Sequence, residues 1–254
     1  VLGPESRIVP ITYVNSTAAI KAFVGANGGA CCTSSNADLV FDWAMSQGDV
    51  RILFLPDQHL GRNTASKFGI DVARHAALYD PKLARQGEPL GGMTPDQLVD
   101  ARVILWAGHC SVHKLFRPEH CDAIREQSPR TKIIVHPECC KEVVDKADLA
   151  GSTEFIIRTI EEAPAGSRWA VGTEVHLVHR LANEAADRGV DVRILSDCQC
   201  LCTTMYRIDQ AHLLWILDGL AEGQVRNRIQ VHPEVRGPAL EALDRMLALQ
   251  PSSV

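Results

Sequence analysis

Two stretches of this chain follow the same order of strand-like runs, polar turns and helical patterns. The first reads "ITYVNSTAAIKAF", "CCTSSNADLVFDW" and "RILFLPDQHLGRNTA". The second reads "IIVHPECCKEVVDKA", "LAGSTEFIIRTI" and "RWAVGTEVHLVHRLA". Matched residues keep their spacing, since Ser34 precedes Asp57 by 23 residues and Ser152 precedes Glu174 by 22. An internal repeat of this kind predicts two copies of one structural module.

Short β-rich runs alternate with helical patterns along the chain. This alternation predicts parallel sheets flanked by helices, and so an α/β fold. Functional residues in such sheets gather at the carboxyl ends of the strands. We expect strands over residues 8–13, 51–55, 103–106, 132–135, 169–171 and 192–195, helices after each, and two further helices over 210–221 and 238–249.

Composition narrows the class of protein. The chain has 254 residues, 46% of them hydrophobic, which is enough for a sizeable core. Its net charge of −5 and lack of a basic stripe argue against a nucleic-acid partner. The sequence has no apolar run of membrane-spanning length and no signal-peptide pattern at its start. Nine cysteines without an export signal predict a cytoplasmic protein whose thiols bind metal or do chemistry.

Each copy of the repeat ends in a strand that leads to a cysteine. "ARVILWAGHC" leads to Cys110, and "DVRILSDCQC" leads into a group that ends at Cys202. Thiolates are soft ligands for zinc, copper(I) and iron–sulfur clusters. The spacing leaves three hypotheses open: a zinc site, a thiol–disulfide pair among Cys198, Cys200 and Cys202, or a cluster held by cysteines of separate modules.

Serine and threonine residues stand where two of the expected helices begin. "CTSSNADL" contains Ser34, and "AGSTEFII" contains Ser152 and Thr153. Capping of the helices is one explanation for these hydroxyls. Binding of a carboxylate or phosphate at a helix N-terminus is the other. Because the feature occurs at matched positions of the repeat, we favour the binding role.

Candidate proton-transfer residues follow the matched first strands of the two copies. "VHPE" places His136 and Glu138 directly after one strand, and Tyr13 and Asn15 end the equivalent strand. An imidazole beside a carboxylate can move protons near neutral pH. His113, three residues after Cys110, either faces the same space or caps a surface helix.

Seven strings identify a family resemblance. "YVNSTAAIKA", "CCTSSNA", "FLPDQHLGRNTA", "GHCSVH", "VHPEC", "AGSTEFII" and "GTEVHLVHRLA" resemble quinolinate synthase, the iron–sulfur enzyme of NAD (pyridine nucleotide) biosynthesis. The resemblance runs in order from about Ile11 to Met246. Only the stretch around residues 71–100 lacks the family's strings.

The resemblance implies a domain arrangement. It implies three-layer α/β/α modules with short parallel sheets around a pseudo-threefold axis, of which the first is incomplete here. Residues 1–108 would form the second module, with an excursion over 71–100, and residues 109–203 the third. The helices of residues 204–254 would pack with the truncated first module.

The resemblance also implies a cofactor. Each module of the family supplies one cysteine to a [4Fe–4S] cluster, and one iron is left open. Cys110 matches the family's "G-x-C-x-V-H" string, and Cys202 matches a ligand three residues before a methionine, here Met205. The third cysteine is expected upstream of "YVNS", outside this chain.

The implied reaction is a transferase reaction. Iminoaspartate condenses with dihydroxyacetone phosphate to quinolinate, with loss of phosphate and water. The iminoaspartate would come from L-aspartate oxidase or aspartate dehydrogenase, and neither nucleic acid nor membrane is an expected partner. The family's catalytic positions match Tyr13, His136 and Glu138, and its substrate contacts match these three together with Asn15, Ser34, His113, Ser152 and Thr153.

Two other functions remain as alternatives. A zinc- or thiol-based binding module would use Cys198–Cys202, and it would be colourless with bound zinc where a cluster protein is brown. A metal-free phosphosugar isomerase or aldolase of α/β type would keep its activity after Cys110 and Cys202 are changed to serine.

Overall fold

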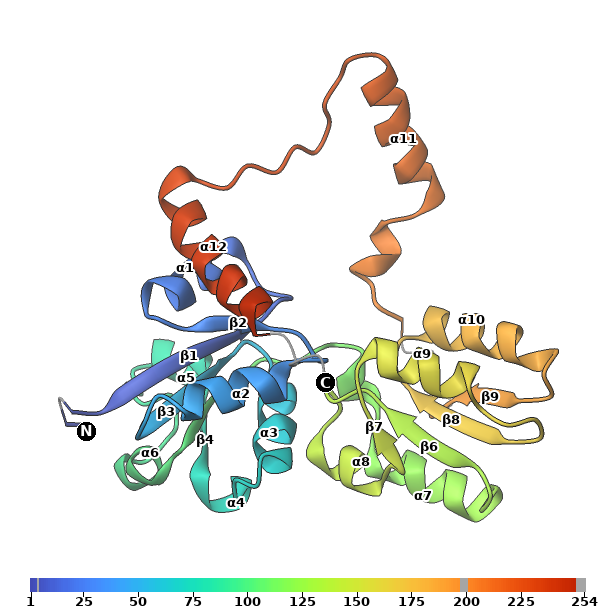
Figure 1. Ribbon diagram of the computed structural model, residues 1–254, viewed down its shortest axis with the longest axis horizontal. Coiled ribbons are helices and arrows are strands. Elements are labelled where there is room, and N and C mark those ends of the chain that lie inside the picture. The colour runs from blue at the N-terminus through green and yellow to red at the C-terminus, as the bar shows by residue number, and fades with distance from the viewer. Residues whose placement is uncertain (4, 197–200, 250–254) are drawn as a thin grey trace.

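The structure is a computed structural model that describes residues 1–3, 5–196 and 201–249. In this part of the chain, the strands form two separate sheets (Figure 1). Every strand pairing in both sheets is parallel. The predicted α/β class with short parallel sheets is therefore confirmed.

The first sheet has the strand order β2-β1-β3-β5-β4. Buried residues alternate between its faces, as a two-residue side-chain period requires. Ile52 and Phe54 of β3 face helices α2 and α3, whereas Leu53 faces α1, α6 and α12. The strands are β1 (Arg7–Tyr13), β2 (Ala30–Cys32), β3 (Val50–Leu55), β4 (Ala76–Tyr79) and β5 (Val103–Trp106), and the helices are α1 (Ala18–Ala26), α2 (Ala37–Met45), α3 (Gln58–Lys67), α4 (Val72–His75), α5 (Pro81–Arg85) and α6 (Pro95–Asp100).

The second sheet has the order β7-β6-β8-β9. Helices α9 and α10 cover one of its faces, and α7 and α8 cover the other (Figure 1). Successive residues of β6 again take opposite sides, with Ile133 on the α7 side and Ile134 on the α9 side. The elements are β6 (Lys132–Val135), β7 (Leu149–Ala150), β8 (Arg168–Gly172), β9 (Asp191–Ile194), α7 (Pro118–Gln127), α8 (Lys141–Lys146), α9 (Thr153–Glu161) and α10 (Val175–Ala186).

The sequence repeat is visible in the topology. Strand β1 lies between β2 and β3 in the first sheet, and the matched strand β6 lies between β7 and β8 in the second. Strand β9 then takes the position of β5. The stretch 71–100 adds β4 beyond β5, together with α4, α5 and α6, and has no counterpart in the second sheet.

The last two helices differ in how they pack. Helix α12 (Pro233–Ala248) lies along α1, where Ala242 and Met246 pack against Val24 and Cys31. Our prediction of this helix over 238–249 missed its first turn, because Pro233 is the residue at the N-terminus and Pro238 lies inside the helix.

Helix α11 (Gln210–Ala221) extends away from both sheets (Figure 1). Among its residues, Gly219 is buried, and four leucines are more than half exposed: Leu213, Leu214, Leu217 and Leu220. Among the described helices, none is both long enough and apolar enough to cross a membrane.

The contact between α1 and α12 depends on Gly25. A Cβ at this position would lie 1.8 Å from the carbonyl oxygen of Pro238, a backbone atom that cannot turn away. We expect Gly25→Ala to destabilise the docked helix by about 1–3 kcal/mol, as overpacking does. Gly237→Ala is the matched control on α12, because its Cβ would meet open space. Urea unfolding measures both variants, and equal stability of the two would contradict this packing.

Cys31 makes the same contact sensitive to alkaline pH. Burial raises the pKa of its thiol from 9.0 to about 11, against a smaller opposing effect of Lys21. Between these values the unfolded chain loses the proton that the native chain keeps, so the free energy of unfolding falls as pH rises. We expect a loss of up to about 3 kcal/mol between pH 9 and 11, which Cys31→Ala removes.

The control for this pH dependence is Val24→Ala, which lies in the same hydrophobic cluster but carries no titrating group. It should lower stability by the same amount at every pH. A pH slope that Cys31→Ala leaves unchanged would assign the effect to another group.

Candidate active site

A cavity of about 1040 Å³ lies where the carboxyl ends of the two sheets face each other. Tyr13 lines it from the end of β1, and His136 lines it from just beyond the end of β6. Such a position is where open parallel sheets place their ligands. Eight predicted site residues line this cavity: Tyr13, Asn15, Cys110, His113, His136, Glu138, Thr153 and Cys202.

The other two predicted residues, Ser34 and Ser152, line a neighbouring cavity of about 520 Å³. Tyr13 connects the two cavities, since it lines the larger one and its side chain forms a hydrogen bond with that of Ser34. Burial and the charge of Glu138 raise the pKa of Tyr13 above its ordinary range, so the phenol keeps its proton at neutral pH.

The two serines differ in local role. Ser152 caps α9, with its hydroxyl oxygen accepting from the backbone N–H of Phe155 at 3.3 Å. The capping explanation fails for Ser34, because Asn36 is the N-cap residue of α2. Helix capping therefore explains the hydroxyl of Ser152 but does not explain that of Ser34.

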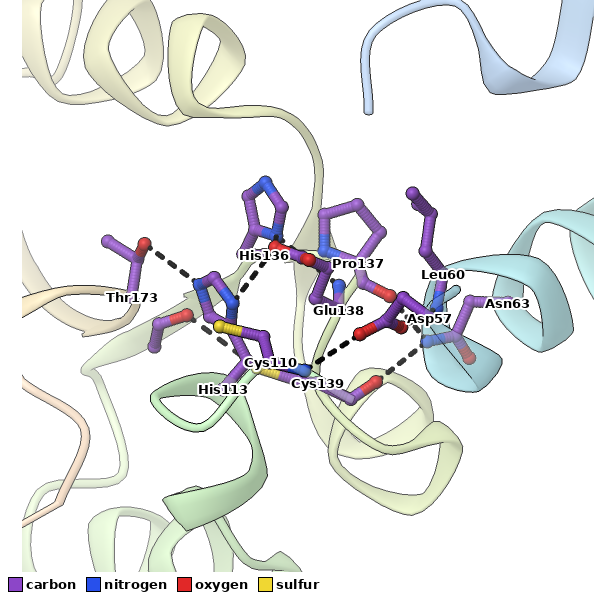
Figure 2. Close-up of polar contacts among 11 residues, drawn as sticks. Asp57, Leu60, Asn63, Cys110, His113, His136, Pro137, Glu138, Cys139 and Thr173 are labelled. Atoms are coloured by element: carbon purple, nitrogen blue, oxygen red, sulfur yellow. Dashed lines mark hydrogen bonds and ion pairs between the residues drawn. The ribbon is translucent and has the colours of Figure 1, made fainter. Parts of the chain in front are cut away.

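Asp57 holds the backbone of Cys110 (Figure 2). One carboxylate oxygen caps α3 by accepting from the N–H of Leu60, and the other accepts from the N–H of Cys110, both at 2.8 Å. Burial and the charge of Glu138 raise the pKa of Asp57 to about 7, although these two bonds act in the opposite direction. The bond to Cys110 fixes where its thiol can lie.

A second pair of hydrogen bonds connects the parts of the chain that form the two sheets. The side-chain amide of Asn63 on α3 donates to the carbonyl oxygens of Pro137 and Cys139, both at 2.8 Å (Figure 2). These carbonyls flank Glu138. A helix of the first sheet therefore fixes the loop that carries the central carboxylate of the second.

Glu138 contacts the edges of two histidine rings that stack on each other. The ring centroids of His113 and His136 are 4.4 Å apart. The Nδ1 atoms of His113 and His136 lie 3.1 and 3.3 Å from Oε2 of Glu138. All three side chains are at least nine-tenths buried.

The two rings have opposite pKa shifts. Burial disfavours a charge on His113, but contacts with Cys110 and Glu138 outweigh burial and raise its pKa to about 9. Burial and the neighbouring charge of His113 lower the pKa of His136 well below its ordinary value. At neutral pH His113 is a cation and His136 is neutral.

The backbone fixes the tautomer of His136. Its Nδ1 accepts from the N–H of Glu138 at 3.3 Å, so the ring proton is on Nε2. His136 can therefore donate a hydrogen bond to a bound group, while the adjacent carboxylate of Glu138 can accept a proton.

Soft ligand atoms are also present in this cavity. Sγ of Cys110 lies within 4.8 Å of donor atoms of His113 and Glu138. Cys202 lines the same cavity, and both cysteines pack against one hydrophobic cluster of the second sheet. The cysteines within the described ranges are free thiols, whereas Cys198 and Cys200 lie outside those ranges.

Comparison with known proteins identifies the family. A family model for quinolinate synthetase A protein matches residues 4–248. A curated quinolinate synthase of a Nocardioides species is 53% identical over 253 residues, which are 97% of this chain and 62% of that protein. The chain belongs to the quinolinate synthase family.

Other curated quinolinate synthases are similar to this chain to the same degree. That of Acidobacterium capsulatum is 52% identical over 98% of this chain and 65% of its own length. That of Streptomyces coelicolor is 50% identical over 97% of this chain and 61% of its own length. The predicted family resemblance is confirmed, and the chain spans less than two thirds of these relatives.

Several residues that line the cavity were not among the predicted site residues. Asp57 and Glu174 occupy matched positions of the repeat and cap α3 and α10, so their nearly equal distances from Ser34 and Ser152 were an available signal. Thr173, whose hydroxyl lies 3.2 Å from Nε2 of His113, gave no such signal. His176 also lines the cavity, and its Nδ1 lies 2.8 Å from Oε1 of Glu174.

The bond from Cys110 to Asp57 can be tested without a cofactor. In Asp57→Asn the side-chain oxygen can still cap α3, but the amide nitrogen cannot accept from Cys110. We expect hydrogen exchange of the Cys110 amide to accelerate roughly 10-fold or more while that of Leu60 stays protected. Nuclear magnetic resonance measures both amides.

Asp80→Asn is the matched control, because Asp80 caps α5 in the same way and lies on the surface. It should change neither amide. Acceleration at Leu60 with no change at Cys110 would show that Asp57 acts only as a helix cap.

Proposed function

We propose that this chain carries the reaction of quinolinate synthase, the condensation of iminoaspartate with dihydroxyacetone phosphate to quinolinate. The reaction releases phosphate and water, and it makes the protein a transferase of NAD biosynthesis. One observation carries the proposal: a single cavity between the two sheets receives Tyr13, His136 and Glu138 together with Cys110 and Cys202.

The cavity suits anionic substrates. Thr153 is the first residue of α9, where the helix dipole favours negative charge, and its side chain lines the cavity. Arg180 and the charged ring of His113 line it too. Asn15 adds an amide at the end of β1. We propose that these groups bind the carboxylates and the phosphate of the substrates. Ser34 and Ser152, which line the neighbouring cavity next to Tyr13, would add hydroxyl groups to this binding.

Proton transfer is assigned to three residues. Loss of water requires one proton to leave carbon and another to reach the departing oxygen. Glu138 accepts the first, because it lines the cavity and His113, whose Nδ1 lies 3.1 Å from its Oε2, orients the carboxylate. Tyr13 and His136 are the donors, since both hold a proton at neutral pH.

The donor set fits a [4Fe–4S] cluster in part. Two thiols, Cys110 and Cys202, line one cavity, and thiolates are the ligands that such clusters use. By the family resemblance, a third cysteine upstream of "YVNS" completes the set. When bound, a cluster with an open iron supplies a Lewis acid that polarises a hydroxyl or carbonyl oxygen.

We propose that the additional part of the longer relatives covers the open side of the cavity. We propose the module boundaries 1–108, 109–203 and 204–254, with the last segment packing with a further module. The exposed leucines of α11 support this, because an apolar face of that extent needs cover. So does the greater length of the relatives.

The cellular compartment of the protein and the source of its substrate iminoaspartate follow from the same proposal. We place the protein in the cytoplasm, which the free thiols of the described cysteines support. Iminoaspartate is the imine that oxidation of aspartate yields. L-Aspartate oxidase or aspartate dehydrogenase is therefore the expected source.

The experiment joins this chain to the portion of the Nocardioides quinolinate synthase that it does not span. Quinolinate formation and iron content are measured without oxygen. In the completed enzyme, Glu138→Gln should lower turnover at least about 100-fold and leave the iron content unchanged. Cys202→Ser should lower the iron content itself.

Glu142→Gln is the matched control, since Glu142 lies four residues further on, exposed on α8. It should leave turnover unchanged. Full turnover in Glu138→Gln would remove this residue from the mechanism. Full turnover in both Cys110→Ser and Cys202→Ser would favour the metal-free isomerase or aldolase.

A further inference from the structure

Residues 201–209 lie between β9 and α11 and carry Cys202 (Figure 1). Two hydrogen bonds close a turn in this segment. The backbone N–H of Tyr206 donates to the carbonyl oxygen of Cys202 at 2.9 Å, and the N–H of Met205 donates to Sγ of Cys202 at 3.5 Å. Cys202 and Tyr206 therefore belong to one hydrogen-bonded turn, and the position of the tyrosine affects that of the thiol.

The ring of Tyr206 contacts His176 of α10. The two rings stack with their centroids 6.0 Å apart and their planes inclined by 23°. Both side chains are more than half exposed, so this stack is not part of a hydrophobic core. Within the part of the chain that the structure describes, the hydrogen bonds of residues 201–208 stay inside that segment. The stack is thus a contact that connects the segment to α10.

His176 is in turn fixed by Glu174. A carboxylate only accepts hydrogen bonds, so Nδ1 of His176 donates to Oε1 of Glu174, at 2.8 Å. The other carboxylate oxygen accepts from the backbone N–H groups of His176 and Leu177 and so caps α10. Glu174 is buried, with 8% of its surface exposed. The orientation of the exposed imidazole is therefore set by a buried, helix-capping carboxylate.

These contacts end at the cavity between the two sheets. Glu174, His176, Met205 and Cys202 all line it. The contacts run from the capping carboxylate through the imidazole and the tyrosine ring to the turn that carries the thiol. Because the backbone of Tyr206 is bonded to that of Cys202, loss of the stack would free this turn from α10.

We propose that Glu174, His176 and Tyr206 are positioning residues that hold the thiol of Cys202 toward the cavity. The inference rests on the proposed function, in which this thiol is a ligand of an iron–sulfur cluster. A ligand that is ordered in advance binds more tightly, since its freedom is not lost at the moment of binding. Residues that orient a metal ligand are for this reason part of a metal site.

The first experiment measures alkylation of single cysteines by iodoacetamide in the chain without metal and without oxygen, followed by tandem mass spectrometry. Tyr206→Leu and His176→Ala should speed alkylation of Cys202 about 2- to 10-fold, the change that loss of an aromatic pair allows. Alkylation of Cys110 should not change. Tyr206→Phe keeps the ring and should restore the rate of the unmodified chain.

His179→Ala is the matched control, because it removes an exposed imidazole one turn further along α10. It should leave the rate at Cys202 unchanged. Cys32, which is fully buried, should stay unreactive in every variant, since the ring of Tyr206 is exposed and its loss leaves the core intact.

The second experiment uses the completed enzyme described above and follows the transfer of its iron to a chelator. Tyr206→Leu should release iron about 10-fold faster, as loss of a residue that orients a metal ligand does. Tyr206→Phe should release it at the rate of the unmodified enzyme.

Equal alkylation of Cys202 in Tyr206→Leu and in the unmodified chain would overturn the positioning role, whatever the turnover of the enzyme. So would a rate in Tyr206→Phe as high as that in Tyr206→Leu, because the ring would then have no effect. Faster alkylation in Tyr206→Leu, with a completed enzyme that binds no iron, would support the positioning of the thiol and contradict the proposed function. The two proposals therefore fail by different measurements.

Discussion

Parallel pairing in both sheets determines where this chain can do chemistry. In a parallel sheet all strands end at one edge, so polar residues that follow separate strands meet there. The two such edges face each other across one cavity, which Tyr13 and Cys110 line from one sheet and His136 and Thr173 from the other. Asn63 fixes this arrangement, because its amide reaches from α3 to two carbonyls beside the central carboxylate.

Burial gives these residues their distinct roles. Two carboxylates, Asp57 and Glu138, lie close enough to influence each other in a region with little water, so the pKa of Asp57 rises to about 7. Contacts with Cys110 and Glu138 raise the pKa of His113, and burial together with the charge of His113 lowers the pKa of His136. The charge on Glu138 therefore contributes, beside burial, to the pKa shifts of Tyr13, Asp57 and His113. This coupling suits proton transfer.

Much of the fold could be predicted because the repeat and the hydrophobic periods are local signals. Strands β5 and β6 were predicted with their observed ends. The short strands β2 and β7 and the edge strand β4 were missed because none of them carries a strong period. The candidate site was predicted through motifs that follow strands. Thr173 was missed because only the three-dimensional structure brings it to His113, and protonation states depend on burial that a sequence does not show.

The central claim is that two thiols that follow strands of different sheets, Cys110 after β5 and Cys202 after β9, open on one cavity. Short bifunctional thiol reagents of graded length test it most directly, with linked peptides identified by mass spectrometry. The account predicts a link between Cys110 and Cys202 in the native chain, lost when the chain is unfolded in urea. Links from Cys202 only to Cys198 or Cys200, with Cys110 modified singly at every length, would contradict it.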